Sequence, residues 1–133
     1  MQIKVTVENT TLPIHVIHLD GNLDAGTYQD FQSKADDLIA KGATRILVNL
    51  ADVSFISSAG LRSLHGIFTR LRSIHHDISD EELRVKMRSG KYKSPYLKVC
   101  GLSPRTREIF QISGLDTYIE THKDTAEGII SFQ

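Results

Sequence analysis

The chain has 133 residues, of which 40% are hydrophobic and 24% are charged. This length and apolar content favour one folded domain with a single core and exclude wholesale disorder. Sixteen Lys and Arg residues balance sixteen Asp and Glu residues, so the net charge gives no reason to expect nucleic acid or an anionic membrane as a partner. The one cysteine, Cys100, excludes an internal disulfide framework and any multi-cysteine metal site.

The N-terminal residues predict a strand and not a targeting segment. Residues 1–7 alternate apolar and polar side chains, whereas a signal peptide has a basic start and then a continuous apolar run. No stretch approaches the roughly 18 apolar residues that suggest a membrane span. We therefore expect a soluble cytoplasmic protein, and the cysteine usage fits a reducing compartment.

The first part of the chain predicts a hairpin, a helix and a buried strand. Alternation with period two predicts strands at 3–7 and 12–19. Apolar residues at helical spacing predict a helix over 28–41 that stops at Gly42. The compact apolar run at 45–50 is typical of a strand buried on both faces of a sheet.

Two adjacent serines lie where the next helix is expected to begin. Apolar side chains from Leu61 to Leu71 mark one face of that helix, and Ser57 or Ser58 can cap it. The free N–H groups and the dipole of a helix N-terminus favour an anion, including a phosphate carried by a serine. From these physical facts alone a plain helix cap is the favoured interpretation, with phosphorylation as the functional alternative.

Residues 73–94 are poor in core-forming side chains and segregate charge. An acidic cluster at 77–82 precedes a basic run from Arg84 to Lys98. We interpret 73–94 as a long excursion that holds at most a short helix, a kind of segment that is often functional or mobile. A solvated loop is favoured for the basic run over a docking surface for acidic partners.

The C-terminal part predicts two more helices and two strands. Residues 96–100 resume strand character, Ser103 and the following proline begin a helix, and 117–119 are expected to form a short edge strand. The last helix is expected to start at Thr121 or Thr125. Its inward-facing residues are expected to be Ala126, Ile129 and Ile130.

Common catalytic and metal-binding motifs are absent from the sequence. A nucleophile elbow around Ser58 needs a glycine where Ile56 stands, so only Gly60 fits that motif. No phosphate-binding Gly-x-x-x-x-Gly-Lys-Ser/Thr run occurs, and the six histidines lack zinc-protease spacing. Surface or cap positions are therefore expected for the histidines. For Asp24, helix capping is the simple explanation, and cation coordination or tuning of a nearby phosphate is the alternative.

Taken together, four blocks of the sequence resemble the STAS family (sulfate transporter and anti-sigma factor antagonist). The central block, 48–61, resembles the family's central strand, phosphorylation loop and helix start, and it is the most specific of the four. The other three blocks are 21–24, 99–104 and 113–115, and they occur in the order that the family has.

This resemblance implies an α/β fold, with a mixed four- to five-stranded sheet and helices mainly packed on one side. A single STAS domain would span 1–133, with the excursion at about 73–94. The resemblance also implies a non-enzymatic antagonist without a cofactor or metal. When unphosphorylated, such a protein binds an anti-sigma factor that is also a serine kinase, and so frees a sigma factor for transcription. The kinase phosphorylates the antagonist to release it, and a PP2C-type phosphatase restores it, with no direct contact to nucleic acid or membrane.

By position, Ser58 corresponds to the phosphoacceptor of the family. Many antagonists carry an aspartate immediately before the acceptor, and this chain has Ser57 there, so Ser57 remains a second choice. The residues expected around the phosphosite and at the partner interface are Asn22, Asp24, Ser57, Ala59, Gly60, Leu61 and Arg62.

Three alternatives remain open at the level of the sequence. The chain could be a STAS scaffold subunit of a larger signalling assembly, or a domain that originates from a transporter. A small hydrolase or nucleotide-binding protein that uses Ser58 and Asp24 is the least favoured, because the motif glycines are missing.

Overall fold

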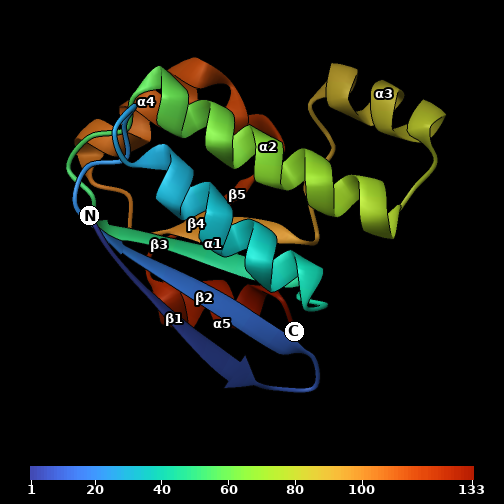
Figure 1. Cartoon of the computed structure of the whole chain (residues 1–133). Coiled ribbons are helices and arrows are strands. Elements are labelled where there is room, and N and C mark those ends of the chain that lie inside the picture. Colours follow the sequence, from blue (N-terminus) through green and yellow to red (C-terminus); the bar gives the residue numbers. More distant parts are fainter.

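A five-stranded mixed sheet forms the centre of the protein, in a computed structural model that describes all residues 1–133 (Figure 1). The strand order is β1-β2-β3-β4-β5. The first two strands form an antiparallel hairpin, and each later strand is parallel to its neighbour. The strands are β1 (Gln2–Asn9), β2 (Pro13–Asp20), β3 (Arg45–Asp52), β4 (Leu97–Cys100) and β5 (Glu120–His122). The predicted mixed sheet is confirmed.

Five α-helices and one short 3-10 turn complete the fold. The helices are α1 (Tyr28–Ala40), α2 (Ser58–His75), α3 (Asp80–Ser89), α4 (Pro104–Ser113) and α5 (Thr125–Ser131), and the 3-10 turn is Leu115–Thr117. The predicted start of α4 is confirmed, since Ser103 caps it in a capping box with Thr106 and Pro104 follows at the first helical position. None of these helices combines the length and the apolarity needed to cross a membrane.

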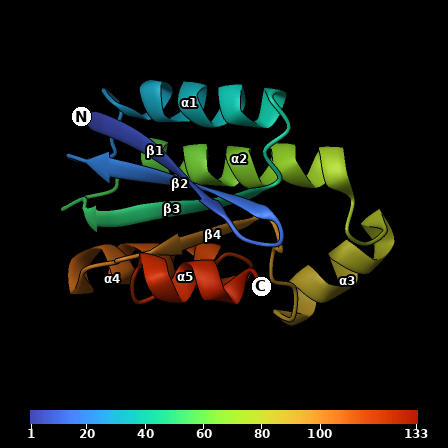
Figure 2. The same ribbon diagram turned by 90° about the horizontal axis from the view of Figure 1, so that it is seen from below.

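Most of the core lies on one face of the sheet. Helices α1 and α2 cover this face (Figure 2). Phe110 of α4 belongs to the same core cluster as Ile46 and Val99 of the central strands. The opposite face is covered by α5 over a smaller cluster that includes Leu47 and Cys100. The expectation that helices pack mainly on one side is therefore confirmed, with α5 as the exception.

One prediction for the C-terminal part is wrong in position. The edge strand β5 begins at Glu120, three residues later than expected, because Tyr118 and Ile119 are both buried in the main core and Leu115–Thr117 forms the 3-10 turn. Helix α5 begins at Thr125, which confirms one of the two predicted starts, and its cap is Asp124, whose carboxylate accepts from the Glu127 N–H at 2.9 Å.

The inward face of α5 matches the prediction only at Ile129. Ile130 is 67% exposed and Ala126 is exposed, whereas Gly128 is buried and Ile129 packs against the smaller core cluster. A Cβ on Gly128 would lie 2.8 Å from a methyl carbon of Leu47. The helix can approach β3 only because residue 128 has no side chain, and this contact fixes which face turns inward.

The excursion at 73–94 is more structured than the sequence suggests. Helix α2 continues to His75, and the predicted short helix is α3. Its acidic first turn and basic last turn match the helix dipole, which accounts for the segregated charge. Lys98 does not belong to a solvated run: it is 5% exposed on β4, and its ammonium donates to the Ser131 carbonyl oxygen at 2.9 Å at the end of α5.

Candidate functional site

Three loops that leave the sheet gather at one end of the protein. Strands β2, β3 and β4 are mutually parallel, so their carboxyl ends meet at the same edge. The loop after β2 joins the loop after β3 through a parallel bridge between Leu23 and Ile56. The loop after β4 follows at Gly101, where an added Cβ would lie 2.9 Å from the Ala51 nitrogen. This end of the sheet positions the predicted site residues.

The two serines have different structural roles. Ser57 has an extended backbone and caps α2, because its Oγ accepts from the Gly60 N–H at 3.3 Å and its carbonyl oxygen accepts from the Leu61 N–H at 2.9 Å. Ser58 is the first helical residue, and it is exposed. The helix cap predicted for this pair is therefore Ser57, which leaves the Ser58 side chain facing solvent.

The two loops are in contact through their main chains. The Ser57 N–H donates to the Leu23 carbonyl oxygen at 2.9 Å, and the Leu23 N–H donates to the Phe55 carbonyl oxygen at 3.0 Å. A Cβ on Gly60 would lie 2.6 Å from that same Leu23 oxygen. Glycine at position 60 thus allows the first turn of α2 to lie directly against the loop before α1.

Asp24 organises the turn before α1 and is not the helix cap. Its Oδ1 accepts from the Gly26 N–H at 2.9 Å and from the Thr27 hydroxyl at 3.3 Å. The N-cap residue is Thr27, whose hydroxyl donates to the Asn22 carbonyl oxygen at 2.7 Å and makes no capping bond to the helix. The structure brings Asn22 and Asp24 to the serine loop through their neighbour Leu23.

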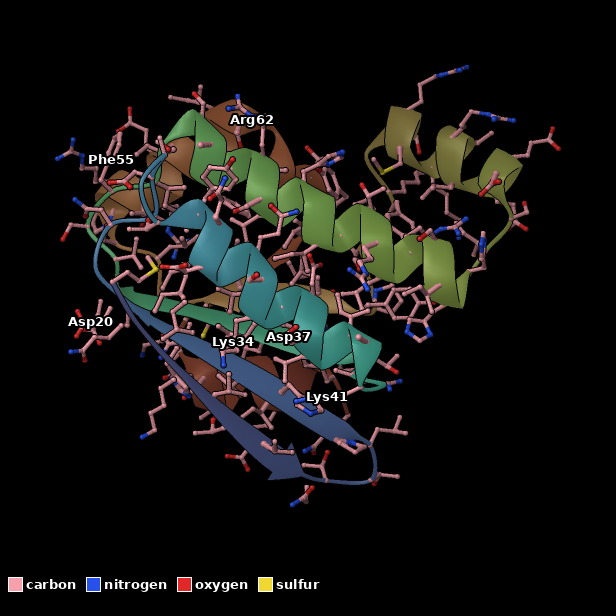
Figure 3. All side chains as sticks on the ribbon, viewed as in Figure 1. Asp20, Lys34, Asp37, Lys41, Phe55 and Arg62 are labelled. Atoms are coloured by element: carbon pink, nitrogen blue, oxygen red, sulfur yellow. The ribbon has the colours of Figure 1, made fainter.

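The remaining predicted residues divide into buried and exposed positions. Ala59 and Gly60, in the first turn of α2, are buried. Leu61 is half-buried, and Arg62 is exposed. Figure 3 shows Arg62 on α2 and Phe55 on the preceding loop at this end of the molecule. The exposed surface is therefore formed by side chains of the loop and by one helix face.

One contact at this end has no counterpart in the sequence analysis. The Arg105 guanidinium of α4 lies 5.3 Å from the centre of the Phe55 ring, which is within the range of a cation–π interaction. No spacing rule relates residues 50 positions apart. The one signal in the sequence is Phe55 itself, the single aromatic residue of the loop 53–57, and the structure leaves it half-buried.

The segment from Val53 to Leu61, called the serine segment below, lies outside the cavities of the protein. Four surface cavities are present, with volumes of about 220 to 430 Å³, and none is lined by a residue from 54 to 62. The segment from Val53 to Leu61 also carries no charged residue. It is thus a neutral surface and not a cleft for a small molecule.

The histidines form no metal cluster, and none of them is among the predicted site residues. No group of three or more His, Cys, Asp or Glu side chains could hold a metal ion. His76 is the C-cap of α2, as one of the expected cap positions. His18 departs from the surface expectation: it is half-buried, and its ring bonds to Thr6 at 2.9 Å and to Asn49 at 3.0 Å.

Known proteins resemble the chain in sequence and in fold. BtrV of Bordetella bronchiseptica, which is named as an anti-sigma factor antagonist, is 26% identical over 96 residues, which are 72% of this chain and 66% of the relative. The crystal structure of a Thermotoga maritima protein, also named as an anti-sigma factor antagonist, matches this structure with a TM-score of 0.74 at 14% sequence identity. The match covers 98% of this chain and 93% of the Thermotoga chain.

A further solved structure carries a phosphate. SpoIIAA, a Bacillus cell fate determinant, matches in its phosphorylated form with a TM-score of 0.62 at 24% identity, covering 98% of this chain and 100% of its own. These structures show that the fold is the SpoIIAA-like α/β fold. The profile of the STAS domain matches residues 4–78, which are more than half of the 133 residues. The chain belongs to the STAS domain family and is similar to the anti-sigma factor antagonists within it.

Proposed function

We propose that this protein is an anti-sigma factor antagonist whose binding to its partner is switched by phosphorylation of Ser58. The observation that carries the proposal is the exposure of Ser58 at the first position of α2, beside a neighbour that is already engaged as the cap. Solved SpoIIAA structures include an unphosphorylated and a phosphorylated form, which supports a phosphate switch on this fold.

Ser58 is favoured over Ser57 as the acceptor on geometric grounds. The Ser57 Oγ accepts from the Gly60 N–H, so its phosphorylation would disturb the cap that starts α2. The Ser58 side chain makes no hydrogen bond within the protein, and its own N–H and that of Ala59 have no backbone acceptor. A phosphate on Ser58 would therefore meet free N–H donors and the positive end of the helix dipole without breaking an existing bond.

The switch would act through charge on a neutral surface. The unphosphorylated segment 53–61 would dock on a kinase-fold anti-sigma factor with no charged side chain of its own to desolvate. A phosphate adds about −1.5 to −2 charges and bulk at this interface, which raises the desolvation cost of docking. Arg62 lies one turn along α2 from Ser58 and is exposed, so it can pair with the phosphate and hold it on the protein surface.

The partners follow from this scheme. The anti-sigma factor is a serine kinase that uses ATP, and a PP2C-type phosphatase removes the phosphate, with the antagonist supplying no catalytic residue. We place the exchange in the cytoplasm, where the resemblance to anti-sigma factor antagonists locates it. We also propose that 1–133 acts as a single STAS domain, which a sheet that runs from Gln2 to His122 supports.

Phosphopeptide mapping and calorimetry test this function together. After incubation with candidate anti-sigma factor kinases and ATP, the phosphate is expected on Ser58. Ser58→Ala should bind the kinase as the wild type does and resist phosphorylation, whereas Ser58→Asp should bind less well.

Ser57→Ala is the matched control at the neighbouring position. It should lose about 1 kcal/mol of stability through the missing cap and should still accept phosphate on Ser58. Equal kinase affinity of the Ser58→Ala and Ser58→Asp variants contradicts the switch. A phosphate found only on Ser57 contradicts the choice of acceptor.

A further inference from the structure

The sheet has one long free edge. Strand β1 is the outermost strand and pairs on one side only, with β2, over all eight residues Gln2–Asn9 (Figure 1). The opposite edge strand, β5, has three residues. A free edge of this length presents a row of unpaired N–H and C=O groups that another extended strand can complete. None of the candidate site residues lies on β1.

The sequence of β1 is self-complementary in one antiparallel register. When a strand pairs with its own copy about a twofold axis through one residue, the numbers of opposing residues add up to twice that residue's number. With the axis at Thr6 the numbers add up to 12, so Lys4 faces Glu8 of the second copy, and Glu8 faces its Lys4. A twofold axis at Val5 or at Val7 would place neither Lys4 nor Glu8 opposite a charged residue of the second copy.

The side chains on the two faces of β1 suit this register. Lys4, Thr6 and Glu8 share one face because side chains alternate along a strand, and both Lys4 and Glu8 are exposed. On the other face, Val5 packs partly against the main core, while Val7 is 47% exposed. The register that pairs Lys4 with Glu8 also sets Val7 opposite Val5 of the second copy and covers it.

We propose that β1 is a homodimer interface, in which two copies of this chain pair their β1 strands antiparallel about Thr6 and join their sheets into one ten-stranded sheet. The occupant is a second copy because the charge pattern of the edge matches itself: two Lys4–Glu8 pairs and two Val5–Val7 pairs form by symmetry. A twofold axis perpendicular to the sheet carries each face onto itself. The helices α1 and α2 of both copies therefore lie on the same side.

Charge reversal on β1 tests the register by loss and rescue. Sedimentation equilibrium over a concentration series is expected to show a reversible dimer for the wild type. Lys4→Glu sets two Glu–Glu pairs opposite each other and Glu8→Lys sets two Lys–Lys pairs, so each variant should weaken dimerisation about tenfold. The double variant Lys4→Glu/Glu8→Lys restores opposite charges and should dimerise as the wild type does.

The mixture of the two single variants makes the prediction more specific. A Lys4→Glu chain and a Glu8→Lys chain oppose unlike charges at both positions, so a heterodimer should form although each chain alone stays largely monomeric. Arg84→Glu, an exposed charge on α3, is the matched control and should leave the dimer unchanged. A wild-type monomer at every concentration overturns the proposal, as does a dimer that the two single reversals do not weaken.

Disulfide trapping tests the register without changing charge. The only native thiol, Cys100, is buried, and this burial raises its pKa to about 12, so it does not compete. Under oxidation Thr6→Cys should give a covalent dimer, because residue 6 faces its own copy across the axis. Val7→Cys should not, because residue 7 faces residue 5. Equal cross-linking of both variants contradicts the register.

Discussion

At Gly60 the main chain of α2 lies against the main chain of the loop before α1. A Cβ at this position would lie 2.6 Å from the Leu23 carbonyl oxygen and 2.9 Å from Leu23 Cγ. Real Cβ atoms do not approach a backbone oxygen this closely, so either the loop or the helix start has to move. This contact, and not the intrinsic flexibility of glycine, requires glycine beside the serine pair.

Gly60→Ala is therefore expected to destabilise the protein by about 1–3 kcal/mol, the typical cost of overpacking. Urea unfolding followed by circular dichroism measures it. Gly66→Ala is the matched control on the same helix, since its Cβ would meet only the end of the Gln32 side chain at 3.5 Å. Removing a mid-helix glycine there should stabilise the protein by about 0.5–1 kcal/mol. Equal effects at the two positions would contradict the close contact at Gly60.

At the scale of elements, Arg72 ties the loop before α3 to the body of the fold, in addition to the apolar contacts that Ile78, Leu83 and Met87 make with the main core. It is 4% exposed on α2, and its guanidinium donates to the Ile78 carbonyl oxygen at 2.6 Å and to the His76 ring at 2.7 Å. The same group lies 3.3 Å from Asp77 and 3.2 Å from Asp80. One cation thus holds the loop that leads into α3, a helix with no buried residue of its own.

Arg72→Leu should release α3 while the sheet stays folded. The variant loses its charged hydrogen bonds, each worth about 1.5–3 kcal/mol, and leaves Asp77 with Tyr92 as its remaining partner. Hydrogen exchange measured by mass spectrometry should accelerate for 77–90 and stay unchanged for β2 and β3. Arg70→Leu is the control, since Arg70 pairs only with Asp36 on the surface. Unchanged exchange in α3 would show that other contacts hold it.

The sequence predicts most elements because their signals are local. It fails where a contact between distant segments determines which face of an element turns inward or where a side chain lies. A serine cap at 57 or 58, the Ser103–Pro104 start of α4 and the stop at Gly42 are local signals, and the structure has all three, with Ser57 as the cap. The inward face of α5 depends on the approach of Gly128 to Leu47, and the position of Asp24 beside the serine loop depends on the bridge of its neighbour Leu23 to Ile56.

At the scale of the whole molecule, the net charge of zero is a sum of locally matched groups. Acids begin α3 and bases end it, and Arg72 lies among carboxylates. The serine segment 53–61 stands apart because it contributes no charge of either sign. On the proposed function, a phosphate on this segment would add about −1.5 to −2 charges where there are none, more than the single charge of Arg62 offsets, and would change binding at this end without breaking a contact of the fold.

The pH dependence of global unfolding is linked to His18, which connects three strands. Its ring bonds to Thr6 of β1 and Asn49 of β3, and burial, with a contribution from the Lys4 charge, lowers its pKa below the ordinary value of 6.5. In the unfolded chain His18 takes up a proton at about pH 6.5, before the folded protein does, so its contribution to stability is lost as the pH falls below that value.

His18→Gln removes this titration. The wild type should lose stability between pH 8 and pH 5 more steeply than the variant, in urea unfolding at a series of pH values. Parallel stability curves for the two proteins would mean that the folded and unfolded states protonate His18 alike.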